Sequence, residues 1–183
     1  MLREPVSIHS IASLSPLGMG PEASWEGYLG PTHALSRLEN GPATGEFVGK
    51  LPESTAALLD KIKASRSAYK NLDSSVLSAI AVSREAVAQA GWRSGSAFGI
   101  NLGSSRGATG LFEEYHEEFR ATGRVGTQAS PSTTLGNIAS WVAQDLRSEG
   151  PELSHSITCS TALHALLNGV AWLRSGMARK FLV

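Results

Sequence analysis

Cys159 is the only cysteine among the 183 residues, and its position suits a nucleophile. The sequence predicts a short strand over 153–158 and a helix over 160–175, so the thiol would lie where the strand meets the helix. Unpaired N–H groups and the positive end of a helix dipole favour the thiolate, which is the reactive form of cysteine. The neighbouring side chains are small enough to admit a substrate: Thr158, Ser160, Thr161 and Ala162. The alternative is a small buried hydrophobic residue, the usual role of a lone cysteine.

Ser105 is a second candidate nucleophile. It lies in the segment Gly-Ser-Ser-Arg-Gly over 103–107, which matches the G-x-S-x-G turn of serine hydrolases and follows a predicted strand. Asp145 and His155 come later in the order that such a triad requires, although a carboxylate on a helix is more often simply solvated. The turn lacks the lysine of a phosphate-binding loop and the glycine spacing of a dinucleotide-binding turn, so the sequence does not favour nucleotide binding.

The histidines of the chain do not form a metal-binding pattern. The five histidines are scattered singly, and one cysteine allows neither an internal disulfide nor a cysteine-rich zinc site. His164 falls on the predicted helix over 160–175, and we expect it to be a hydrogen-bonded core residue.

Strand patterns and helix patterns alternate along the chain, which predicts a layered α/β fold. The predicted helices cover about 54–64, with Ser54 as N-cap, about 73–90, and segments that begin near 111 and 135. Strands are predicted over 6–14, 97–102 and 153–158, and residues 30–50 are predicted to be an irregular loop. The helix over 160–175 is apolar on nearly every face, so we expect it to be buried in a large protein.

Composition excludes several classes of protein. Sixteen basic residues balance sixteen acidic ones, which argues against a nucleic-acid binder, and 42% hydrophobic residues can build a core. Residues 1–5 lack an apolar signal core, and no apolar run reaches membrane-spanning length, which predicts a cytoplasmic protein without a membrane span. Residues 180–183 begin a predicted strand that has no closing turn, so we expect the natural protein to continue beyond Val183.

Three segments resemble the N-terminal half of the β-ketoacyl synthases, the condensing enzymes of fatty-acid and polyketide synthesis. The first runs from Val6 to a Ser-Pro-Leu-Gly turn over 15–18. The second begins with Gly-Ile-Asn-Leu-Gly-Ser over 99–104. The third runs from Gly-Pro at 150–151 through Ser-Ile-Thr-Cys-Ser-Thr-Ala over 156–162, and places Cys159 where the family has its nucleophile.

The resemblance implies a thiolase-like layered α/β fold, with residues 1–183 forming an N-terminal domain around a mixed sheet and a buried helix after the nucleophile. It implies that Cys159 accepts an acyl group as a thioester and supplies the first oxyanion donor through its N–H. A malonyl unit on acyl carrier protein, attached through a phosphopantetheine thioester, would then be decarboxylated and would attack that thioester. The basic residues for this step come from the family's C-terminal half, and no permanently bound cofactor is implied.

The resemblance also suggests an acyl tunnel, partners and a rival function. Arg106, Gly107, Thr133 and Ala162 would line the tunnel. Because Arg106 stands where the family often has an apolar residue, a polyketide-like product fits at least as well as a long saturated chain. We expect a homodimer or heterodimer with contacts near 130–141 and the strand before Cys159. The rival function is a non-catalytic scaffold or partner subunit of a synthase complex.

Overall fold

A three-stranded parallel sheet in the order β6-β5-β7 holds the candidate site. In the computed structural model, which describes residues 5–41 and 43–183, β5 (Gly99–Gly103) is the central strand. It pairs with β6 (Glu152–His155) on one side and with β7 (Phe181–Leu182) on the other. Two parts of the sequence predictions lie outside the described residues. They are residues 1–4, in the N-terminal segment that lacks a signal core, and residue 42, in the predicted loop.

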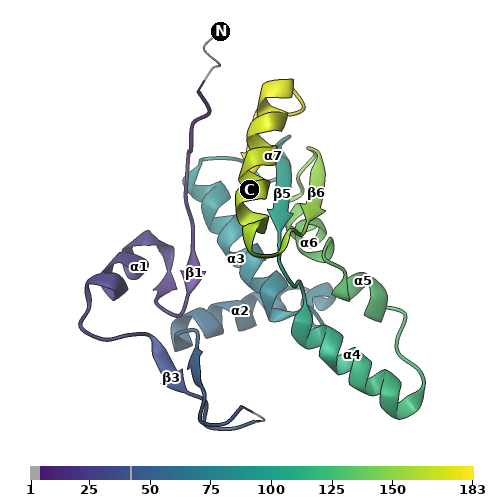
Figure 1. Cartoon of the computed structure of the whole chain (residues 1–183). Coiled ribbons are helices and arrows are strands. Elements are labelled where there is room, and N and C mark those ends of the chain that lie inside the picture. Colours follow the sequence, from purple (N-terminus) through teal and green to yellow (C-terminus); the bar gives the residue numbers. More distant parts are fainter. Residues whose placement is uncertain (1–4, 42) are drawn as a thin grey trace.

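Helices account for most of the remaining ordered chain (Figure 1). They are α1 (Gly20–Leu29), α2 (Glu53–Ser65), α3 (Ser74–Gln89), α4 (Thr109–Thr122), α5 (Ala129–Thr133), α6 (Asn137–Leu146) and α7 (Thr161–Ser175), with 3₁₀ turns η1 (Ser67–Tyr69) and η2 (Thr158–Ser160). Two small antiparallel pairs join β1 (Leu14–Ser15) to β2 (Gly18–Met19) and β3 (Leu35–Arg37) to β4 (Phe47–Gly49). None of the helices in the described ranges is long and apolar enough to cross a membrane.

The sheet separates two layers of helix. On one face, α6 packs on β5 and β6, and α3 packs against α6. Buried apolar residues from these elements and from α2 form one core, which includes Ile62, Val76, Ile80, Ile100 and Val142. On the other face, α7 packs along β5 (Figure 1). This arrangement confirms the predicted layered α/β fold.

Several predicted elements are confirmed, and others are corrected. The helix predicted over 73–90 is α3, with Asp73 as its N-cap, and strands are present near 97–102 and 153–158. The predicted loop over 30–50 contains the β3–β4 hairpin. Ser54 is not an N-cap, because α2 begins one residue earlier at Glu53.

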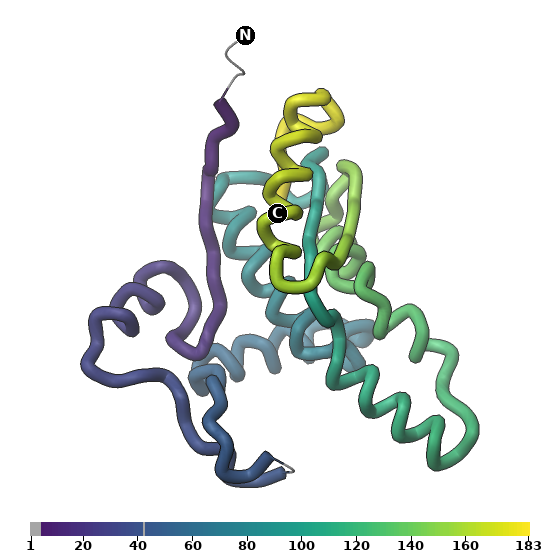
Figure 2. The backbone as a smooth tube through the Cα atoms, viewed as in Figure 1, coloured from purple at the N-terminus to yellow at the C-terminus, as the bar shows by residue number. Residues whose placement is uncertain are grey.

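The predicted opening strand over 6–14 is wrong for most of its length. Residues 5–13 run extended beside the body of the protein, and only Leu14 belongs to a strand (Figures 1 and 2). This segment, α3, α7 and β7 line a cavity of about 920 Å³, and the Ser10 hydroxyl donates a hydrogen bond of 2.8 Å to the carbonyl of Ala86 in α3. A strand needs a hydrogen-bonding neighbour, and none of the described residues pairs with 5–13 as a ladder.

The predicted burial of the helix over 160–175 is only partly met. The buried residues of α7 form one narrow stripe, Thr161, Ala165 and Gly169, which faces the sheet. Leu163 and Leu167, on the outer side, are 72% and 61% exposed. The helix is apolar on both sides, but the described chain covers only one of them.

Candidate functional site

The candidate site lies where β5 and β6 end. Because the two strands are parallel, their carboxyl ends meet at one edge of the sheet, and Gly103 is directly opposite His155. The turn over 104–107 follows β5, and η2 follows β6. The two connections touch, since the Ser156 hydroxyl donates a hydrogen bond of 3.5 Å to the carbonyl of Ser105.

Cys159 lies in η2, immediately before α7, as the sequence predicts. Its thiol is free and exposed, which excludes the small buried hydrophobic role. The preceding residue, Thr158, has a φ of +49°, in the left-handed region that β-branched residues rarely adopt. No hydrogen bond occupies the N–H of Cys159 within the part of the chain that the structure describes. The chain therefore presents both the thiol and this N–H at a tight strand-to-helix turn.

The glycine-rich turn is held by its own first residue. The Ser104 hydroxyl accepts a hydrogen bond of 2.8 Å from the N–H of Gly107. Gly107 has a φ of +66°, and a Cβ there would lie 3.1 Å from the Leu135 side chain, so the position favours glycine. Arg106 points outward from this turn, is exposed, and makes no ion pair with the described residues.

The other two proposed tunnel residues lie on separate helices. Thr133 is half-buried at the end of α5, where its hydroxyl donates to the carbonyl of Ala129 at 2.7 Å. Ala162 is exposed in the first turn of α7. Gly107 lies close to Thr134 and Leu135, the residues that follow Thr133. The structure therefore brings the turn over 104–107 close to the end of α5. Whether the four residues line one tunnel stays a prediction.

The serine-hydrolase interpretation is wrong. A triad needs a histidine hydrogen-bonded to both the serine and the acid. Both ring nitrogens of His155 are buried and have no hydrogen-bond partner among the described residues. Asp145 lies in α6, on the opposite face of the sheet from α7, and its carboxylate is bound by other side chains.

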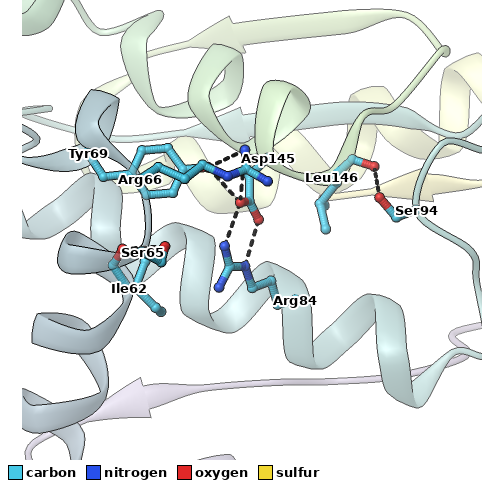
Figure 3. A network of polar contacts seen from close by, with 8 residues as sticks. All are labelled: Ile62, Ser65, Arg66, Tyr69, Arg84, Ser94, Asp145 and Leu146. Atoms are coloured by element: carbon cyan, nitrogen blue, oxygen red, sulfur yellow. Dashed lines mark hydrogen bonds and ion pairs between the residues drawn. The ribbon is translucent and has the colours of Figure 1, made fainter.

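Asp145 instead forms the centre of a structural network that joins α3, α6 and η1 (Figure 3). Arg84 donates two hydrogen bonds to its carboxylate, at 2.8 and 2.6 Å, and the Tyr69 hydroxyl donates a third at 2.7 Å. Arg66 donates to the Tyr69 oxygen at 2.9 Å and lies 3.9 Å from the carboxylate. This buried acid has the partners that it needs, so it is not a solvated helix residue.

The network shifts the titration of its members. Burial would raise the pKa of Asp145, but the hydrogen bonds from Arg84 and Tyr69 and the positive charges outweigh burial, so the pKa is lowered. Burial, reinforced by the hydrogen bond to Asp145, raises the pKa of Tyr69. The hydrogen bond to Asp145 also raises the pKa of Arg84. Asp145 is therefore ionised and Tyr69 neutral at neutral pH.

Two residues that support the site were not singled out from the sequence. Asn101 in β5 is fully buried and donates a hydrogen bond of 2.8 Å to the carbonyl of Ala165 in α7. Thr161, noted only as a small neighbour, is buried at the start of α7. The signal for Asn101 was a polar residue inside an apolar strand. His164 is hydrogen-bonded as predicted, 3.0 Å from the Ser160 carbonyl, but it is only half-buried.

Comparison with solved structures shows which proteins share the fold of this chain. The chain is similar to the ishigamide ketosynthase/chain length factor, with a TM-score of 0.78 and 17% identity over 95% of this chain and 45% of the other. It is also similar to a β-ketoacyl synthase from Burkholderia phymatum STM815, with a TM-score of 0.70 and 16% identity over 93% of this chain and 43% of the other. The chain thus spans less than half the length of these two relatives. No curated protein sequence matches it.

The family model for the N-terminal domain of β-ketoacyl synthases matches residues 3–183, nearly the whole chain. The match includes the strand-to-helix turn with Cys159 and the sheet that positions it. The chain therefore belongs to the β-ketoacyl synthase family, as an N-terminal domain with a thiolase-like fold.

Proposed function

We propose that the chain carries the nucleophile of a cytoplasmic condensing enzyme, and that Cys159 accepts an acyl group as a thioester. The observation that carries this proposal is the exposed thiol of Cys159 in the tight turn before α7, beside a backbone N–H that has no other partner among the described residues. In the acyl transfer the sulfur attacks the carbonyl carbon of an incoming thioester and displaces its thiol. The N–H of Cys159 would donate to the oxygen that becomes negative in the intermediate.

The second step needs groups from outside this domain. A malonyl thioester on acyl carrier protein would lose carbon dioxide, and the resulting carbanion would attack the acyl carbon on Cys159 and release the thiolate. In the family, the basic residues and the second oxyanion donor come from the C-terminal half. We therefore expect residues 1–183 alone to accept an acyl group but to form no carbon–carbon bond.

We propose acyl carrier protein as the partner, because an exposed thiol at a surface turn is within reach of a phosphopantetheine arm. Arg106 is exposed in this domain; with Arg106 lining the acyl tunnel of the complete enzyme, a polyketide-like chain is favoured over a long saturated one, since packing alkyl groups against an unpaired guanidinium is costly. Acylation by short and long acyl thioesters can be compared directly. Arg106→Leu should speed acylation by the long-chain thioester relative to the short one, and an unchanged ratio would contradict this role.

Peptide mapping by mass spectrometry tests the nucleophile. The purified chain is incubated at neutral pH with iodoacetamide, or with an acyl thioester of pantetheine, and the peptide that contains Cys159 is weighed. We expect alkylation faster than that of a free model thiol, and an acyl adduct that Cys159→Ser abolishes. Modification only after denaturation would overturn the proposal and would favour the non-catalytic scaffold.

A further inference from the structure

We infer that Thr161 is a positioning residue for Cys159, and that its hydroxyl holds the turn that presents the thiol. This inference rests on the proposed role of Cys159. Thr161 is the first residue of α7 and is only 3% exposed, so its polar group must find partners within the protein. Both of those partners are backbone groups of the two residues that precede the cysteine.

The hydroxyl of Thr161 closes the turn from two sides. It accepts a hydrogen bond of 2.9 Å from the N–H of Ile157, and it donates one of 2.6 Å to the carbonyl of Thr158. Thr158 is the residue with a φ of +49°, a conformation that a threonine does not adopt without support. The two hydrogen bonds bracket this residue and supply that support.

The methyl group of Thr161 fixes the direction of the hydroxyl. It packs so closely on β5 that a Cβ at Gly103 would overlap its Cγ2. One helical turn later, the carbonyl of Ala165 accepts the hydrogen bond from Asn101, also in β5. The central strand therefore holds the start of α7 at two points, and the Thr161 hydroxyl is aimed at the turn.

Loss of the hydroxyl would leave the N–H of Ile157 without an acceptor and would remove one of the two hydrogen bonds to the carbonyl of Thr158, so the left-handed φ of Thr158 would lose support. Cys159 is the next residue, so its thiol and N–H would turn away from the start of α7. The bonds that remain are weaker constraints on the turn: the hydroxyl and the N–H of Ser160 donate to the carbonyl of Ile157 at 3.0 and 3.2 Å, and the N–H of Thr161 donates to the carbonyl of Thr158. None of them holds the N–H of Ile157. The reactivity of the thiol should therefore depend on a hydroxyl two residues away.

The test uses two variants of the 183-residue chain. Thr161→Val keeps the shape and the methyl contact but removes the hydroxyl, and Thr161→Ser keeps the hydroxyl. The Thr161→Val change removes both hydrogen bonds of the hydroxyl, and a single lost bond corresponds to about fivefold. We expect the rate of Cys159 alkylation by iodoacetamide to fall by at least about fivefold in Thr161→Val, and to stay within about twofold of the parent in Thr161→Ser. Rates are measured well below each thermal midpoint, so that they report folded protein.

Thr122→Val is the matched control. The hydroxyl of Thr122 also bonds backbone groups at the end of a helix, but in α4, and its loss should leave the alkylation rate unchanged.

Equal rates in the parent and in folded Thr161→Val would overturn the inference while the proposed function stands. A parent Cys159 no faster than a model thiol would overturn the proposed function itself. If Thr161→Val does not fold, amide hydrogen exchange decides, because fast exchange of the Ile157 N–H in the folded parent contradicts the bond on which the inference rests.

Discussion

At the scale of single residues, the sequence predicted the position of Cys159 in the fold but not the structural role of Asp145. Cys159 could be placed correctly because its setting is local: a strand before it, a helix after it and small residues around it. The role of Asp145 could not be predicted, because Arg84 lies 61 positions away in the sequence and Tyr69 lies 76 away. The left-handed Thr158 was also unpredictable, since local preference disfavours it and only the contacts of Thr161 compensate.

Removal of the Asp145 charge should destabilise the chain. Asp145→Asn keeps the shape of the side chain but leaves Arg84 without its anionic partner. We expect the free energy of unfolding to fall by about 2 kcal/mol, less than for a fully buried pair because Arg84 is partly exposed. Urea denaturation measures the loss. Asp60→Asn, on the exposed side of α2, should change the stability by less than about 0.5 kcal/mol, and equal losses in both variants would contradict the role of the network.

The same network predicts how stability depends on pH. The pKa of Asp145 is lowered in the folded state, so the unfolded chain binds the proton more tightly. The stabilisation is complete above the unfolded carboxyl pKa of about 4, and it is lost as the pH falls through the folded pKa. Asp145→Asn should therefore show a shallower loss of stability than the parent below about pH 4. Parallel curves for the two proteins would count against this assignment.

At the scale of helices and strands, the sequence predicted the elements whose own residues show a clear apolar periodicity. α3 was found because its apolar residues recur at helical spacing over sixteen residues. The β3–β4 hairpin was missed because its strands have three residues each and are mostly exposed. The opening strand was predicted from spaced apolar residues and from the family resemblance, but pairing depends on a neighbour that no local pattern can supply.

Gly150 is expected to be indispensable for the approach of β6 to β5. A Cβ at this position would overlap the backbone of Phe98 and Gly99, and backbone cannot move aside as a side chain can. Gly150→Ala should cost about 2–4 kcal/mol of stability or prevent folding. Gly126→Ala, where a Cβ meets no atom within 4 Å, is the matched control and should be neutral or slightly stabilising. Thermal denaturation compares the two, and a stable Gly150→Ala protein would contradict the close packing.

At the scale of the whole molecule, the described chain leaves two kinds of surface uncovered. β6 is an edge strand of the sheet, with Leu153 39% exposed, and edge strands tend to pair with another chain. The outer side of α7 exposes Leu163 and Leu167. Large exposed apolar side chains that form a continuous patch are unusual in a soluble monomer. The family pattern could suggest a dimer from the sequence, but only the structure shows that β6 is an edge strand and that Leu153 on it is exposed.

We therefore expect residues 1–183 to self-associate, with β6 and the stretch over 130–141 near the contact. Sedimentation of the purified chain across a range of concentrations measures this. Leu153→Lys places a charge on the β6 edge and should shift the chain toward monomer by about tenfold in dissociation constant, because a charged side chain opposes edge pairing. Leu29→Lys, on the exposed side of α1, removes a comparable apolar side chain far from β6 in sequence and should leave association unchanged.

Equal effects of Leu153→Lys and Leu29→Lys would indicate unspecific hydrophobic clustering. A monomeric parent that unfolds cooperatively and binds no hydrophobic dye would contradict self-association altogether.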